Sequence, residues 1–186
     1  MRSGWLRSVI SGWAILFGTD CFTHAISAEE PPEGPTLSVC QLVRMCPEEL
    51  ESVYRNGRVP TIPAGKVRGT AIPSPGSSFT PARSNATKVV WQGKVFDSCC
   101  GTATNKFFGV RAVKANVYSG ESWMDSNPAL ILDYRQTSLV YRDVRDEIRE
   151  VGPGLYLGAM YEQHCCGPRL KMYFVLEAPS CCTPCR

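Results

Sequence analysis

Nine cysteines beyond residue 28 are the side chains whose type and spacing are best suited to chemistry. They are Cys40, Cys46, Cys99, Cys100, Cys165, Cys166, Cys181, Cys182 and Cys185. Adjacent cysteines in an extended chain point to opposite sides, so each of the three pairs would bond two different partners. We predict a disulfide scaffold that joins the C-terminal CCTPC segment to the turns at residues 99–100 and 165–166, worth about 2–4 kcal/mol per bridge. The spacing does not determine the pairing, and the odd number leaves one thiol over.

A metal site is the alternative use of the same residues. Cys182 and Cys185 have the CxxC spacing, and His164 with Cys165 would add an imidazole and a thiolate for zinc or Cu(I). A second CxxC is missing, however, and an oxidising compartment would compete for the thiols. The sequence therefore favours the scaffold and predicts no cofactor.

Acid–base or nucleophilic catalysis has little support in the sequence. His164 is the one histidine beyond residue 28, and a neighbouring cysteine does not by itself supply an oriented base. Asp125 and Asp133 are a candidate carboxylate pair, but turn and strand-end hydrogen bonding explains them equally well. No GxSxG, phosphate-loop or HExxH motif is present. We predict no catalytic residue, and an enzyme, either a hydrolase or an isomerase, is kept as an alternative.

Residues 1–28 have the features of a cleavable secretory signal peptide. Arg2 and Arg7 precede an apolar stretch over residues 9–18, which is about half the length of a membrane-spanning helix. Ser27 and Ala28 are small, as a signal peptidase requires. We expect a secreted, periplasmic or cell-envelope protein without a transmembrane anchor after cleavage, and the cysteine content agrees with an oxidising compartment.

The remaining chain is predicted to hold a proline- and glutamate-rich tether, residues 29–37, and a single domain, residues 38–186. The whole chain has 20 basic and 17 acidic residues. This near balance does not argue for nucleic acid or for an anionic membrane surface as a partner.

The hydrophobic pattern predicts an α+β fold that is mainly β. A capping box at Ser38 and a proline at residue 47 predict two N-terminal helices, 38–45 and 47–56. Strands are predicted over residues 65–72, 88–96, 107–119, 129–135, 154–162 and 169–177. Residues 58–87 otherwise resemble loop, and 97–106 a turn. A four-residue spacing of Val140, Val144 and Ile148 predicts one helix, 139–150, between strands. Short gaps favour an antiparallel barrel or a strongly curved sheet.

The motifs WQGKVF (91–96) and GLYLG (154–158) lie within a segment that resembles an uncharacterised family of bacterial lipocalin-like proteins. The resemblance covers about residues 91–161. It implies a small β-barrel with a helix before the strands, and it carries over no catalytic residue.

A barrel of this size holds either a packed core or a cavity for one small ligand. Aromatic and apolar residues on the predicted strands are the candidates for lining such a cavity. They are Trp91, Phe107, Tyr118, Trp123, Tyr156, Met160 and Phe174. The leading hypothesis is an exported module that binds a small apolar ligand. The alternatives are a disulfide-stabilised structural or interaction protein of the envelope or exterior, and a hydrolase or isomerase in the barrel mouth.

Overall fold

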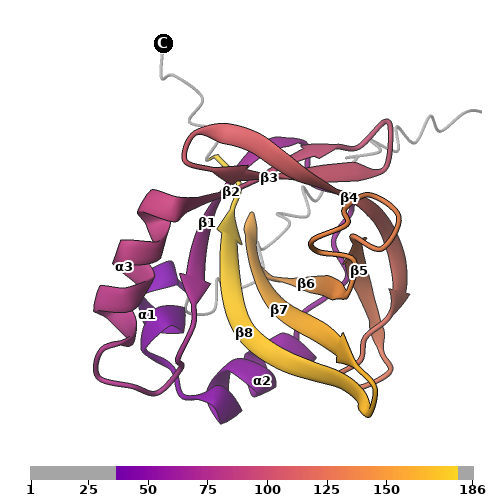
Figure 1. Ribbon diagram of the computed structural model, residues 1–186. Coiled ribbons are helices and arrows are strands. Elements are labelled where there is room, and N and C mark those ends of the chain that lie inside the picture. Colours follow the sequence, from indigo (N-terminus) through magenta and orange to yellow (C-terminus); the bar gives the residue numbers. More distant parts are fainter. Residues whose placement is uncertain (1–36, 180–186) are drawn as a thin grey trace, which may run out of the picture. The chain divides into compact units, whose positions relative to one another are not determined.

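Eight antiparallel strands close into a barrel in the computed structural model, which describes residues 37–179 (Figure 1). The strands are β1 (Gly65–Ile72), β2 (Trp91–Asp97), β3 (Thr102–Phe107), β4 (Val110–Glu121), β5 (Pro128–Asp133), β6 (Val144–Gly152), β7 (Leu155–His164) and β8 (Gly167–Glu177). Each strand pairs with the next one along the chain, and β8 pairs with β1. The predicted class, mainly β with an antiparallel barrel and N-terminal helices, is confirmed.

Helices α1 (Val39–Arg44) and α2 (Pro47–Arg55) begin at the predicted residues. The Ser38 hydroxyl accepts from the Gln41 amide while the Gln41 side chain accepts from the Ser38 amide, so the capping box is formed. Both helices pack on the outside of the barrel. Within residues 37–179, no helix is long and apolar enough to cross a membrane.

The predicted helix over residues 139–150 is wrong, because residues 144–152 form β6. Two further elements were missed. Helix α3 (Thr80–Val90) occupies part of the predicted loop and the start of the predicted strand 88–96, and β3 occupies much of the predicted turn 97–106. The barrel therefore has eight strands instead of six, which allows it to close.

Two hydrophobic clusters hold the domain together. One fills the barrel and consists of Val67, Phe96, Ala103, Ala115, Val117, Leu130, Leu132, Tyr134, Ile148, Tyr156, Phe174 and Leu176. The other lies between α1, α2 and the outer faces of β1, β7 and β8, and consists of Leu42, Val43, Leu50, Tyr54, Ile72, Leu155, Leu157, Ala159, Tyr161, Tyr173 and Val175. Burial on both faces explains why β7 and β8 are such continuous apolar segments.

Two glycines of the WQGKVF and GLYLG motifs shape the barrel interior. Gly93 has a φ of 112°, and the β2–β3 register shifts between Trp91 and Lys94. Because of this bulge, two side chains three residues apart both face inward, where a regular strand would send them to opposite sides. Gly158 faces the ring of Phe174, where an added Cβ would lie 2.1 Å from a ring carbon. Gly93 thus allows a close approach to the backbone of β1, and Gly158 makes room for the Phe174 ring.

The predicted disulfide scaffold is not formed among the described residues. Their cysteines are free thiols, namely Cys40, Cys46, Cys99, Cys100, Cys165 and Cys166. The pair at 99–100 lies in the β2–β3 turn and the pair at 165–166 in the β7–β8 turn, at opposite ends of the barrel. Bridges to Cys181, Cys182 or Cys185 fall outside the described residues.

Candidate functional site

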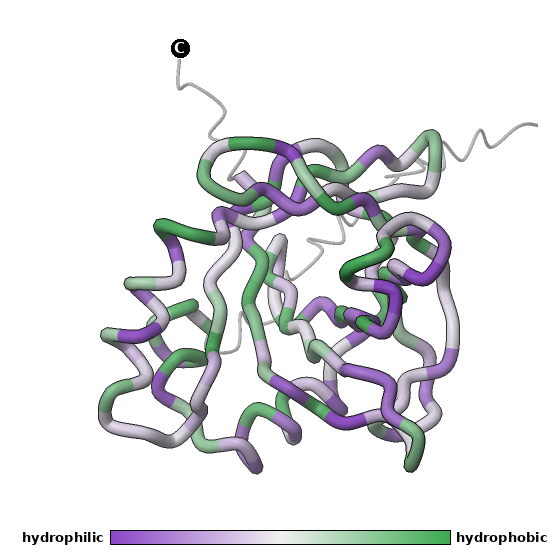
Figure 2. Tube along the Cα trace, in the orientation of Figure 1, coloured by the Kyte–Doolittle hydropathy of each residue, from purple (hydrophilic) through white to green (hydrophobic). Residues whose placement is uncertain are grey.

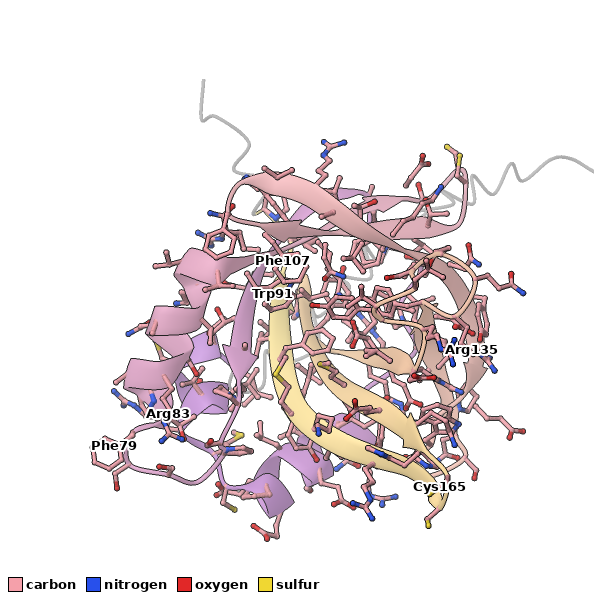
Figure 3. All side chains as sticks on the ribbon, in the orientation of Figure 1. Phe79, Arg83, Trp91, Phe107, Arg135 and Cys165 are labelled. Atoms are coloured by element: carbon pink, nitrogen blue, oxygen red, sulfur yellow. The ribbon has the colours of Figure 1, made fainter. Side chains whose placement is uncertain are left out.

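A cavity of about 250 Å³ lies inside the barrel at one end. We call this end the mouth; it is formed by the end of α3, the β3–β4 turn and the segment 134–143 that joins β5 to β6. The cavity is lined by Ala71, Thr87, Val90, Trp91, Lys94, Asn105, Phe107, Tyr134, Tyr141, Val144, Asp146, Met160, Met172 and Phe174. Figure 3 labels Trp91 and Phe107, which lie at its aromatic side near the top of the view.

Four polar side chains meet at the base of this cavity, and we call them the polar cluster: Lys94, Asn105, Tyr134 and Asp146. The Lys94 ammonium donates to Asn105 Oδ1 at 2.7 Å, to the Tyr134 hydroxyl at 2.8 Å and to Asp146 Oδ2 at 2.8 Å. Tyr134 donates to the same Asp146 oxygen at 2.7 Å and accepts from Asn105 Nδ2 at 2.9 Å. All four residues are buried, so their charges and dipoles neutralise one another without water.

Aromatic rings surround the ammonium of this cluster. Lys94 Nζ lies 5.5 Å from the ring centroid of Trp91, 5.6 Å from that of Tyr134 and 5.4 Å from that of Phe174. These distances allow cation–π attraction. The Trp91 indole also donates to Asn105 Oδ1 at 3.0 Å, so the aromatic wall and the polar cluster hold each other in place.

The hydrogen bonds limit the chemistry that the cluster can perform. Lys94 directs its three hydrogen bonds to Asn105, Tyr134 and Asp146. Burial, followed by the negative charge of Asp146, raises the pKa of Tyr134 well above its ordinary value, so its hydroxyl stays protonated. Both bonds to Asp146 fall on Oδ2, which leaves Oδ1 as an acceptor for a ligand. The cluster therefore pairs one ammonium with one carboxylate.

The structure brings together part of the predicted cavity lining. Trp91, Phe107, Met160 and Phe174 line the cavity. Tyr156 belongs to the core inside the barrel, beyond the cavity. Two of the predicted residues lie outside, which corrects their assignment: the exposed Tyr118 hydroxyl donates to Asp133, and Trp123 packs between Arg145 and Tyr161. Tyr118 faces outward because its strand neighbour Val117 faces the inner core, whereas Trp123 follows the end of β4 and packs against the outer cluster.

The candidate catalytic residues are separated from one another. Asp125 is bound by Arg149 through two hydrogen bonds of 2.7 and 2.8 Å. Asp133 pairs with Arg135, and His164 lies 3.3 Å from a carboxylate oxygen of Glu162. Each group thus has its own local partner, and the three do not face a shared cleft.

The ion pair of Asp125 makes stability depend on pH. The hydrogen bonds from Arg149 lower the pKa of Asp125 from 3.8 to about 2. A carboxylate with a lowered folded-state pKa stabilises the fold above its unfolded pKa, and this contribution is lost as the pH falls towards the folded pKa. We expect roughly 2 kcal/mol of stability to disappear between pH 4 and pH 2. Urea unfolding of wild type and Asp125→Asn across this range checks it: their difference shrinks as the pH falls, whereas a constant difference would contradict the prediction.

The metal alternative gains no support from the described residues, 37–179, which contain no group of three ligand side chains placed for a metal ion. His164 and Cys165 sit at the end of β7 and in the β7–β8 turn, where the sulfurs of Cys165 and Cys166 lie 3.6 Å apart. Figure 3 labels Cys165 in the lower right, away from Trp91. The other two proposed ligands, Cys182 and Cys185, fall outside the described residues.

The polar cluster itself was missed in the sequence. Lys94 stands two residues before Phe96, and Asp146 stands two residues from both Val144 and Ile148. In a strand, residues two apart share a face, so each charged residue lies on an apolar, inward face. A charge on the apolar face of a strand is the signal that would have revealed the cluster.

No protein-family model and no curated protein matches the chain. Among solved structures, the chain is similar to a crystal structure of a protein from Thermomonospora curvata. The identity is 17%, the match covers 74% of this chain and 90% of that chain, and the TM-score is 0.47. At this level the likeness assigns neither a family nor a ligand.

Proposed function

We propose that this protein binds a small, neutral, mostly apolar molecule in the barrel, acting as an exported binding module. The observation that carries the proposal is one partly open cavity that aromatic side chains line and at whose base four buried polar groups converge. Ligand sites in proteins have this composition, with apolar walls and a few placed polar groups. An eight-stranded barrel is also the size that holds one small ligand.

The cavity volume limits the size of the ligand. About 250 Å³ exceeds the 150 Å³ that accommodates benzene in an engineered cavity, and lies below the range of sites for drug-sized molecules. A single aromatic ring or a small bicyclic compound fits these limits. A long acyl chain would protrude through the mouth.

The polar cluster adds a preference for one hydrogen-bond donor. Since Lys94 and Asp146 carry opposite charges, the base of the cavity has no net charge and would reject a bare ion, which would remain unpaired there. The open oxygen of Asp146 can accept one hydrogen bond. A phenol or indole should therefore bind about tenfold more tightly than an aromatic hydrocarbon of the same size.

Filling the cavity should abolish binding. We expect p-cresol and indole, added to the purified protein, to raise the melting temperature and to give a saturable calorimetric titration, with toluene weaker than p-cresol. Met160→Trp places a larger side chain in the cavity and should reduce the affinity by about tenfold or more. The control is Met124→Trp, because Met124 is also partly buried but packs in the outer cluster.

Two results would contradict the proposal. One is the absence of binding by any of these aromatic probes. The other is a Met160→Trp variant that is more stable than wild type and leaves probe binding unchanged. The first would favour a packed, non-binding barrel, and the second would place the probe elsewhere.

A further inference from the structure

Exposed apolar side chains gather at the mouth of the barrel. Of the ten large apolar side chains that are exposed within residues 37–179, six lie on the three segments that form the mouth. They are Val89 and Val90 on α3, Phe108 and Val110 at the β3–β4 turn, and Leu139 and Val140 between β5 and β6. Figure 2 shows green at these three places, around the open end of the barrel. We call these six residues the apolar rim.

The three segments of the apolar rim are joined to one another and to the cavity. The Phe108 amide donates to the Val90 carbonyl at 2.9 Å, which ties the β3–β4 turn to α3. The Phe107 and Tyr141 rings, both of which line the cavity, lie 6.4 Å apart and link that turn to the third segment. Single exposed apolar residues are ordinary, but a group at one end of a molecule marks a contact surface.

The same segments are positively charged. Residues 88–90, 106–111 and 134–143 contain five cations and one acidic residue, Asp143. The cations are Lys88, Lys106, Arg111, Arg135 and Arg142. Asp143 and Asp133, which borders the third segment, pair with its two arginines. Lys106 lies beside two further cations, Lys66 and Arg111, and the charge of Lys66 lowers the pKa of Lys106.

We propose that the mouth docks onto a membrane that contains anionic lipids, with the apolar rim inserted among the lipids and the flanking cations at the headgroups. Apolar side chains at protruding tips with Lys and Arg beside them are the pattern of interfacial membrane binding. A protein or nucleic-acid partner would not require both features around the opening of an apolar cavity. This inference goes beyond the proposed function and would let an apolar ligand pass between the bilayer and the cavity.

Vesicle co-sedimentation tests the proposal. The protein is purified from the exported fraction and its N-terminus is checked by mass spectrometry, so that the apolar residues 9–18 do not contribute. We expect it to sediment with vesicles of phosphatidylcholine mixed with phosphatidylglycerol, and about tenfold less with phosphatidylcholine alone. High salt should weaken the binding without abolishing it, because the apolar part is not screened.

Matched variants distinguish vesicle binding through the apolar rim from nonspecific binding through any exposed apolar side chain. Phe108 and Phe79 are both 69% exposed, but Phe79 precedes α3 at the end away from the mouth (Figure 3). Phe108→Asn should reduce vesicle binding by about tenfold, and Phe79→Asn should leave it unchanged. Asparagine tolerates the positive φ of 47° at residue 108. The pair Leu139→Ser and Val140→Ser should act like Phe108→Asn, since these side chains are 92% and 86% exposed and their loss leaves the core intact.

Three outcomes would overturn membrane docking. The first is that the protein does not sediment with anionic vesicles. The second is that Phe79→Asn reduces vesicle binding as much as Phe108→Asn does. The third is weak vesicle binding together with binding to an acidic polymer, such as heparin, that Phe108→Asn does not change. The last would favour an acidic macromolecule as partner. Titration of p-cresol into the same variants, without vesicles, distinguishes ligand binding from membrane docking, because the rim variants should still bind p-cresol.

Discussion

Replacing Arg149 by methionine is expected to destabilise the fold by about 3–5 kcal/mol, the largest effect predicted here. Arg149 is 1% exposed and binds Asp125, which is 3% exposed, through both of its terminal nitrogens. The same guanidinium donates to the carbonyls of Tyr54, Asn127 and Pro128. The variant would leave several carbonyls unpaired and would leave the buried carboxylate only the more distant Arg55, at 3.9 Å.

The measurement is urea unfolding at neutral pH, followed by circular dichroism. The matched control is Arg58→Met, which removes another arginine that pairs with β6 but whose side chain is 74% exposed. Arg58→Met should lower the free energy of unfolding by at most about 1 kcal/mol. Arg149→Met/Asp125→Asn should recover part of the loss, since the uncompensated charge is gone. Equal effects of Arg149→Met and Arg58→Met would show that the buried pair contributes no more than a surface one.

Lys94→Met is expected to have an effect of similar size, about 3–5 kcal/mol, from the interior of the barrel. Lys94 is 2% exposed, and its removal leaves Asp146 charged without a cation and leaves Asn105 and Tyr134 with one partner fewer. The methylenes are largely replaced by methionine, so most of the loss is electrostatic. Asp146→Asn added to Lys94→Met should restore about half of the stability, because it removes the unpaired charge.

The unfolding measurement again has a matched control. Lys106→Met removes a lysine on the neighbouring strand β3 whose side chain does not line the cavity, and it should change stability by less than about 0.5 kcal/mol. If Lys94→Met is as harmless as Lys106→Met, the polar cluster does not hold the barrel together. If the double variant is less stable than Lys94→Met, Asp146 has a role other than pairing with the lysine.

Strands with an apolar inward face were predictable from the sequence. The prediction over 65–72 matches β1 to the residue, and those over 129–135, 154–162 and 169–177 match β5, β7 and β8 within two residues at each end. Helices α1 and α2 were predictable because the capping signals are local. In each of these elements, the local sequence pattern favours the same secondary structure that the folded protein has.

The two missed strands each contribute a polar side chain to the cavity. On β3 the inward position is Asn105, and on β6 it is Asp146. On β6 the outward side chains Glu147 and Arg149 are buried as well. A polar residue on the inner face breaks the period of two, and the valines and isoleucine that remain happened to recur every four residues. Secondary structure was therefore hardest to predict from the sequence on the strands that supply polar side chains to the candidate site.

The sequence by itself determined the strand-rich character, the two N-terminal helices and the supply of aromatic side chains. It did so because these depend on neighbouring residues and on two-residue or four-residue spacing. Only the tertiary structure decided which polar groups meet inside. Lys94, Asn105, Tyr134 and Asp146 come from β2, β3, the residue after β5, and β6, and closure of the barrel places the other three within 3 Å of Lys94 Nζ. Such a meeting depends on strand register and on the bulge at Gly93, and no local pattern encodes either.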